Sequence, residues 1–246
     1  PPGNPDTSER MYQKDPSILV VMPVYNEQDA IGKVIPDWLA SLDLACCDYT
    51  LLIIDDGSTD NTPEILESLG KTHSRLETLR QSNSGHGQSC LRGYRIAAER
   101  SIPYILQVDS DGQCDPAYFT EFWKKRDLFD VIYGRRSRGD GLWRIVASFC
   151  LKMLLLAGFR VWCVDPNVPY RLMRTAVCRS VFDKIPSGFS LANVALAVGL
   201  SKDRTIRHGQ IPIRFHKRIG GEPSIPIGRF AEKGGGLFRQ LKSLEP

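Results

Sequence analysis

Short apolar runs, each followed by a polar loop and then by a helical pattern, constrain the fold of this chain most strongly. Residues 18–22 (ILVVM) and 49–54 (YTLLII) are rich in β-branched side chains, and an acidic loop follows each run. This succession predicts an α/β fold with a mostly parallel sheet flanked by helices. Further strands are expected over residues 76–80, 104–108 and 131–133. Helices are expected over residues 29–42, 62–71, 86–100 and 116–128.

The second half of the chain has a different pattern. An amphipathic helix is expected over residues 142–159, because Arg144, Lys152 and Arg160 would lie on one side of it and leave the rest of its circumference apolar. Such a helix can lie on a membrane surface. A buried core helix explains the pattern equally well, because most apolar stripes on helices face the core of a protein. The remaining expected elements are a strand over 170–173, helices over 175–182 and 191–198, and a strand over 206–215 that Pro212 restricts to a sheet edge.

Length and charge bound the organisation of the chain. Its 246 residues, 42% of them hydrophobic, predict one domain over residues 17–230, a disordered lead-in over 1–16 and a basic tail over 231–246. The net charge of +4 is too small to indicate nucleic-acid binding. Seven cysteines without a C-x-x-C pair, and no signal peptide, predict a cytoplasmic protein. Lys152 and Arg160 interrupt the longest apolar stretch, which argues against a membrane-spanning helix.

Three polar segments follow predicted strands, over residues 23–27, 55–60 and 109–113. In an open α/β sheet, ligands collect beyond the carboxyl ends of the strands. We therefore expect these three segments to line one crevice.

Asp109 and Asp111 form an Asp-x-Asp motif directly after the apolar run YILQV. Two carboxylates at a strand end, with the amide oxygen of Gln113 nearby, suit Mg²⁺ or Mn²⁺ bridging the phosphates of a nucleotide diphosphate. The competing interpretation is an ordinary solvated loop, in which such a motif is common. The position after a buried strand favours the metal site.

Asp55 or Asp56 can accept a hydrogen bond from the ring N–H of uracil or guanine, or from ribose hydroxyls. Gly57 lets this loop approach a ligand closely. An Asx turn that binds no ligand explains these two residues equally well. For Asp60 we favour the capping of the following helix.

Taken together, these motifs resemble the family 2 glycosyltransferases, which have the Rossmann-like GT-A fold. The segments PVYNE (residues 23–27), DDGSTD (55–60) and NSGHG (83–87), with Asp109 and Asp111, match in order and spacing. The resemblance implies a catalytic domain over residues 17–230 that uses a UDP- or GDP-sugar. It implies nucleotide-binding roles for Pro23, Tyr25, Glu27, Asp55, Asp56 and His86. From the residues alone, Pro23 and Tyr25 also fit a simple turn after the first strand.

Within the family, the second half is similar to the polyprenyl-phosphate sugar transferases of the dolichyl-phosphate mannose synthase type. The D-x-D-x-Q pattern, the stretch GRR (134–136) and the segment RIGGEPS (218–224) carry this resemblance. The chain departs from that group at Pro169 and Tyr170, and at Asn193, where an acidic residue is common. The acceptor and the sugar therefore stay open at this stage.

A separate argument favours a phosphate acceptor. A lipid phosphate is already ionised at neutral pH and needs no general base, whereas a sugar hydroxyl must lose a proton as it attacks. A phosphate needs cations instead. The candidates for binding the acceptor phosphate are Arg136, Arg144, Ser148, Arg218 and Ser224.

The expected protein is a metal-dependent inverting glycosyltransferase acting on a polyprenyl (dolichyl or undecaprenyl) phosphate. Asp109, Asp111, Arg136 and Arg218 are its expected catalytic residues. From residue 202 onward the chain has ten Lys/Arg and four Asp/Glu, which favours association with the anionic cytoplasmic face of a membrane. The alternatives are a soluble transferase acting on a glycan or protein hydroxyl, and a nucleotide-sugar binding module without turnover.

Overall fold

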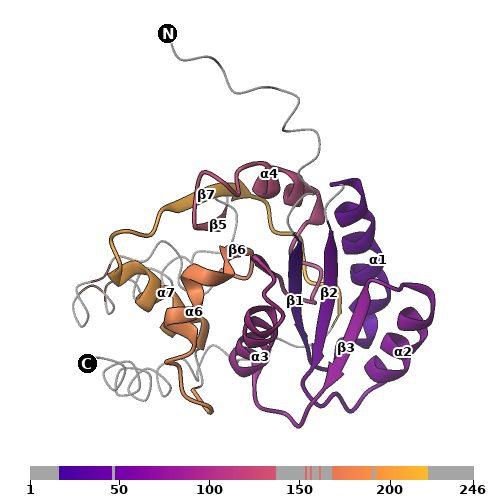
Figure 1. Cartoon of the computed structure of the whole chain (residues 1–246). Helices are drawn as coiled ribbons and strands as arrows, with labels where there is room; N and C mark the ends of the chain where they lie inside the picture. Colours follow the sequence, from indigo (N-terminus) through magenta and orange to yellow (C-terminus); the bar gives the residue numbers. More distant parts are fainter. Residues whose placement is uncertain are drawn as a thin grey trace.

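The computed structural model describes residues 17–45, 48–136, 168–189 and 192–220, together with Met153, Leu156 and Val161. One seven-stranded sheet runs through the molecule in the order β3-β2-β1-β4-β6-β5-β7 (Figure 1). Its strands are β1 (Ile18–Val24), β2 (Tyr49–Asp55), β3 (Leu76–Arg80), β4 (Tyr104–Gln107), β5 (Val131–Arg136), β6 (Arg171–Arg174) and β7 (His208–Ile213). Neighbouring strands are parallel except around β6, which runs antiparallel to both β4 and β5.

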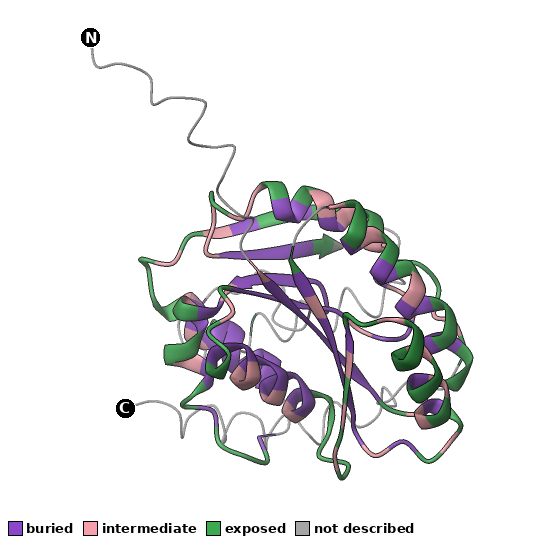
Figure 2. Cartoon of the chain, turned by 45° about the vertical axis from the view of Figure 1, so that its right-hand side comes forward, coloured by how far each residue is buried: buried purple, intermediate pink, exposed green. Residues whose placement is uncertain are grey.

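Helices cover both faces of the sheet. The described helices are α1 (Gln28–Leu44), α2 (Thr62–Thr72), α3 (His86–Glu99), α4 (Phe119–Lys124), α6 (Thr175–Phe182) and α7 (Ala192–Lys202), with a 3₁₀ turn at Pro116–Tyr118. Apolar side chains of α1, α2 and α4 pack on one face, and those of α3, α6 and α7 pack on the other. β1 is buried along its whole length (Figure 2), which explains why it reads as a continuous apolar run rather than an alternating one.

The parallel arrangement brings the loops that follow β1, β2 and β4 to the same edge of the sheet. β1 pairs in parallel with β2 on one side and with β4 on the other. The three polar segments that we predicted to share a crevice therefore leave the sheet at adjacent carboxyl ends.

The structure corrects several expected boundaries. β1 extends to Val24, so Pro23 is a buried strand residue rather than part of a turn. The helix expected over 116–128 is only a 3₁₀ turn followed by the six residues of α4. β7 forms the sheet edge, as Pro212 predicts.

Some predictions lie outside the described residues. These are the lead-in over 1–16, the tail over 231–246 and nearly all of the amphipathic helix over 142–159, of which Met153 and Leu156 are described as helical and exposed. The domain limits at 17 and 230 stay predictions. Among the helices of the described part, none is long and apolar enough to cross a membrane.

Candidate active site

The loops after β1 and β2 are joined by hydrogen bonds. Asn26 adopts a left-handed backbone conformation (φ 52°), and its Oδ1 accepts a hydrogen bond from the N–H of Thr59 at 2.8 Å. The N–H of Glu27 donates to Oγ1 of Thr62 at 3.0 Å. Asp60 accepts hydrogen bonds from the N–H groups of Thr62 and Gln28, at the first turns of α2 and α1. The N-cap residue of α2 is Asn61, and Asp60 beside it accepts from the first N–H of the helix, so its role here is the structural one that the sequence favours. The two loops form one unit.

Asp55 and Asp56 are both buried, and their carboxylates hold the surrounding loops. Oδ1 of Asp55 accepts from the N–H of Ser58 at 2.9 Å. Oδ1 of Asp56 accepts from Nε2 of Gln81 at 2.7 Å, and its Oδ2 accepts from the N–H of Gly85 at 2.8 Å. Of the two oxygens of Asp56, Oδ2 has the fewer partners and keeps capacity for a further donor.

Asp109 and Asp111 follow β4 and lie close enough to influence each other. Asp111 is 8% exposed, and its Oδ1 accepts from the N–H of Gln113 at 3.0 Å. Oδ1 of Asp109 lies 2.9 Å from Nε2 of His86, the first residue of α3. Burial raises the pKa of Asp111 above its ordinary value, and the negative charge of Asp109 raises it further. Such a pair is stabilised by a cation.

Arg218 links the first loop to the Asp-x-Asp motif. Its Nη2 donates to Oε1 of Glu27 at 2.5 Å, and its Nη1 lies 3.4 Å from Oδ2 of Asp111. Our sequence prediction assigned Arg218 to an acceptor phosphate. In the structure it bridges two of the predicted donor-site carboxylates.

The segment that carries Arg218 lies against the Asp-x-Asp turn. The N–H of Ile219 donates to the carbonyl of Asp111, and the N–H of His216 donates to the carbonyl of Gln113, both at 3.0 Å. Gly112 has a φ of +75°, and a Cβ there would come within 2.6 Å of Ile219. Glycine at this position therefore permits the close contact.

Glu27 is 7% exposed, and burial raises its pKa from 4.5 to about 7, although Arg218 opposes this shift. Between about pH 4.5 and about pH 7, Glu27 is therefore protonated in the folded protein and ionised in the unfolded chain. The free energy of unfolding falls as the pH rises through this range. We expect the free energy of unfolding of the wild type, relative to Glu27→Gln, to fall by about 3 kcal/mol between about pH 5 and about pH 8. Urea unfolding in chelator measures this difference.

The exposed Glu64 supplies the control for this experiment. Glu64→Gln should follow the pH profile of the wild type. Parallel profiles for the wild type and Glu27→Gln would contradict the raised pKa of Glu27.

The donor set fits a hard divalent cation. Carboxylates of Asp109 and Asp111 and the amide oxygen of Gln113 are the ligand types that Mg²⁺ and Mn²⁺ take, with phosphate oxygens and water completing the shell. Within the described part of the chain, no group of three or more His, Cys, Asp or Glu side chains is arranged to hold a metal by itself. This arrangement suits a cation shared with a phosphate ligand better than a closed protein site.

The remaining predicted residues are divided. Tyr25 is 44% exposed at the loop after β1, while Pro23 is buried in that strand. Arg136 ends β5, and its side chain lies outside the described part of the structure, as do Arg144, Ser148 and Ser224. Asn26 lies inside the predicted segment 23–27, but the sequence assigned it no role; Gln81, which directly follows the predicted strand over 76–80, was missed.

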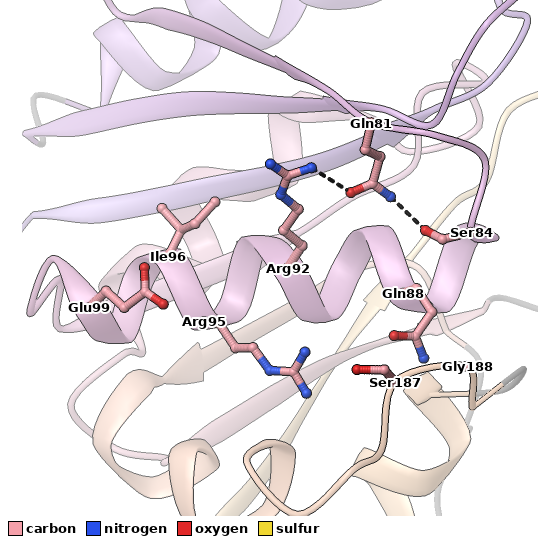
Figure 3. A pocket seen from close by; sticks show the side chains of 9 residues that line it. All are labelled: Gln81, Ser84, Gln88, Arg92, Arg95, Ile96, Glu99, Ser187 and Gly188. Carbon is pink, nitrogen blue, oxygen red and sulfur yellow. Dashed lines mark hydrogen bonds between the residues drawn. The ribbon is translucent and has the colours of Figure 1, made fainter.

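A surface groove of about 580 Å³ runs along α3, beside the predicted crevice (Figure 3). Arg92 and Arg95 line it, and Nη1 of Arg92 donates to Oε1 of Gln81 at 2.8 Å. Through Gln81 the groove contacts Asp56, but it does not include the Asp-x-Asp motif.

The sequence model of Glycosyl transferase family 2 matches residues 19–182, which include both loops and the Asp-x-Asp motif. The chain belongs to glycosyl transferase family 2. A relative from Klebsiella pneumoniae, undecaprenyl-phosphate 4-deoxy-4-formamido-L-arabinose transferase, is 29% identical over 152 residues, which are 58% of this chain and 44% of the relative. The transferase of the same name from Photorhabdus laumondii is 26% identical over 148 residues. This family 2 chain thus matches less than half the length of these relatives.

Solved structures agree on the fold of this family 2 chain. Glucosyl-3-phosphoglycerate synthase from Mycobacterium tuberculosis, in complex with Mn²⁺, uridine diphosphate and phosphoglyceric acid, superposes with a TM-score of 0.64 and 18% identity, over 93% of this chain and 77% of the other. Mannosyl-3-phosphoglycerate synthase from Rubrobacter xylanophilus gives a TM-score of 0.62 at 16% identity, over 93% and 74% of the two chains. The GT-A fold expected from the sequence is confirmed.

Proposed function

We propose that this protein transfers a sugar from a nucleotide diphosphate donor to a polyprenyl phosphate, with inversion at the anomeric carbon and with a divalent cation. The observation that carries the proposal is the meeting of Glu27, Asp111 and Arg218, with Asp109 beside them, at the carboxyl ends of β1 and β4. This edge of an α/β sheet is where ligands bind.

The donor would lie across the joined loops. Tyr25, Glu27 and the buried pair Asp55 and Asp56 would bind the base and ribose, with Pro23 shaping the loop and His86 on the side of the phosphates. Asp109, Asp111 and Gln113 would hold Mg²⁺ or Mn²⁺, which supplies positive charge to the departing diphosphate. The protein residues would then contribute mainly by orientation and charge stabilisation.

The acceptor would attack through a phosphate oxygen. That oxygen forms the new bond to the anomeric carbon as the bond to the diphosphate breaks, and no proton has to be removed. Arg136, Arg144, Ser148, Arg218 and Ser224 are the proposed phosphate-binding residues. Relatives named as undecaprenyl-phosphate transferases support this acceptor class.

A lipid acceptor also implies a location. We place the protein peripherally at the cytoplasmic face of a membrane, where the cations of its C-terminal part would meet anionic lipid. The amphipathic pattern over residues 142–159 is the second feature of the sequence that suits this surface.

Acceptor chemistry is tested by offering UDP- and GDP-sugars with Mn²⁺ and three acceptors: a short-chain polyprenyl phosphate in detergent, the polyprenyl alcohol of the same length, and an oligosaccharide. We expect a sugar-lipid product with the phosphate and none with the alcohol, because only the phosphate is an ionised nucleophile. Mass spectrometry of the lipid product is the measurement. Transfer to the oligosaccharide without transfer to the lipid would contradict the proposal, as would donor binding without turnover on any acceptor.

A further inference from the structure

A set of buried polar side chains lies directly behind Asp109. Gln107, on β4, is 0% exposed, and its Nε2 donates to Oδ1 of Asp109 at 3.3 Å. The hydroxyl of Tyr94, on α3, lies 3.3 Å from Oε1 of Gln107 and 3.1 Å from Oδ1 of Asn193. Contacts of Asn193 with Cys90, at 3.7 Å, and of Cys90 with His86, at 3.9 Å, return to Asp109. These six side chains form a closed ring, which we call the Asp109 ring.

Four members of the Asp109 ring, namely Gln107, Cys90, Tyr94 and Asn193, are buried, while His86 and Asp109 are partly exposed at the site. Cys90, Tyr94 and Asn193 come from α3 and α7, and apolar residues of α3, α6 and α7 surround them. A buried amide or hydroxyl is costly unless it is hydrogen bonded, and apolar side chains would fill the same space without that requirement. Two members of the ring, Gln107 and His86, contact the carboxylate of Asp109, where the cation is proposed to bind.

The protons of the ring can all run towards Asp109. Burial raises the pKa of Tyr94 well above 10, so its hydroxyl keeps the proton. The Tyr94 hydroxyl lies between Oε1 of Gln107 and Oδ1 of Asn193, and both are acceptors for its one proton. When Tyr94 donates to Gln107, Nε2 of Gln107 donates in turn to Asp109. Nδ2 of Asn193 donates to Sγ of Cys90. Gln107 and His86 then occupy Oδ1 of Asp109 and leave Oδ2 for a cation.

We propose that Tyr94 is a positioning residue, which acts through Gln107 to hold Asp109 with Oδ2 towards the divalent cation. This inference rests on the proposed metal-binding role of Asp109. Residues that orient a metal ligand without touching the metal commonly change metal affinity or activity by about 10- to 100-fold. Tyr94 acts through one further side chain, so we expect about a fivefold effect.

The test uses Tyr94→Phe in the whole chain and measures Mn²⁺ affinity in the presence of UDP by electron paramagnetic resonance. The variant removes one hydroxyl and keeps the ring that packs against Phe182. Tyr104→Phe is the matched control, because Tyr104 is also buried, donates to Asp127 at 3.1 Å and packs against Trp123. We expect the dissociation constant for Mn²⁺ to rise about fivefold in Tyr94→Phe and to stay unchanged in Tyr104→Phe, with similar melting temperatures for both.

A second variant separates positioning from general loosening of the core. Gln107→Leu removes the side chain through which Tyr94 acts, so we expect the double variant Tyr94→Phe/Gln107→Leu to bind Mn²⁺ no more weakly than Gln107→Leu alone. Additive effects would overturn the inference, as would equal Mn²⁺ affinities in Tyr94→Phe and Tyr104→Phe. Asp109→Asn separates a failure of the proposed function from a failure of the inference about Tyr94. If neither the wild type nor this variant binds Mn²⁺ with UDP, the proposed function fails and the inference fails with it.

Discussion

Replacing Asp111 by asparagine should lower the turnover number by about a thousandfold. The Asp111 carboxylate is nearly buried, follows β4 and faces the guanidinium of Arg218 at 3.4 Å. Asparagine keeps an oxygen for the N–H of Gln113, so the local turn is retained. What it loses is the negative charge that a divalent cation requires. The measurement is the initial rate of nucleoside diphosphate release at saturating donor, acceptor and Mn²⁺.

Asp130→Asn makes the same chemical change at the opposite edge of the sheet. Asp130 precedes β5 and pairs with Arg207 at 2.9 Å, away from the loops that follow β1 and β4. We expect this variant to retain the wild-type rate within about twofold. A wild-type rate in Asp111→Asn would remove the proposed cation site.

Removing the guanidinium of Arg218 should lower kcat/KM for the polyprenyl phosphate by about 500-fold. In Arg218→Ala the carboxyl groups of Glu27 and Asp111 lose the guanidinium that bridges them. The acceptor phosphate also loses a proposed ligand. The measurement is the initial rate of sugar-lipid formation at low acceptor concentration.

Arg218→Lys tests whether the shape of the guanidinium matters as well as its charge. An ammonium cannot bridge two carboxylates as the planar guanidinium does, so we expect only part of the activity to return. Arg179→Ala, on α6, removes a surface cation paired with Asp183 and should leave the rate unchanged. Equal kcat/KM values for Arg218→Ala and Arg179→Ala would contradict the proposed binding of the acceptor phosphate by Arg218.

β1, β2 and β4 could be predicted from sequence because they are buried on both faces, whereas β3 has only one buried residue. β1 and β2 contain almost only apolar residues, so their hydrophobic runs stand out from the helical patterns between them. The end of α4 at Lys124 could not be predicted, because no glycine or proline follows it before Gly134. The orientation of β6 also escaped prediction, since nothing in a four-residue strand encodes whether it joins its neighbours parallel or antiparallel.

Residues of the candidate site could be proposed from sequence where they follow strands, as Asp56, Asp109 and Asp111 do. Contacts between distant parts of the chain could not. Arg218 and Asp111 are 107 positions apart, and Tyr94 and Asn193 are 99 apart. One signal was present but unused: Gln107 is a polar residue inside the apolar run YILQV, and such a side chain needs a buried partner.

The docking of residues 215–220 onto the Asp-x-Asp turn has a consequence for protein engineering. The backbone of this segment pairs with residues 111–114, but it lies beyond residue 182, where the family match ends. A chimaera that exchanges only residues 19–182 with a relative would combine the relative's Asp-x-Asp turn with residues 215–220 of this chain. Ile219 would then contact whatever side chain replaces Gly112. A chimaera designed to change the sugar donor should therefore exchange residues 19–182 and 215–220 together.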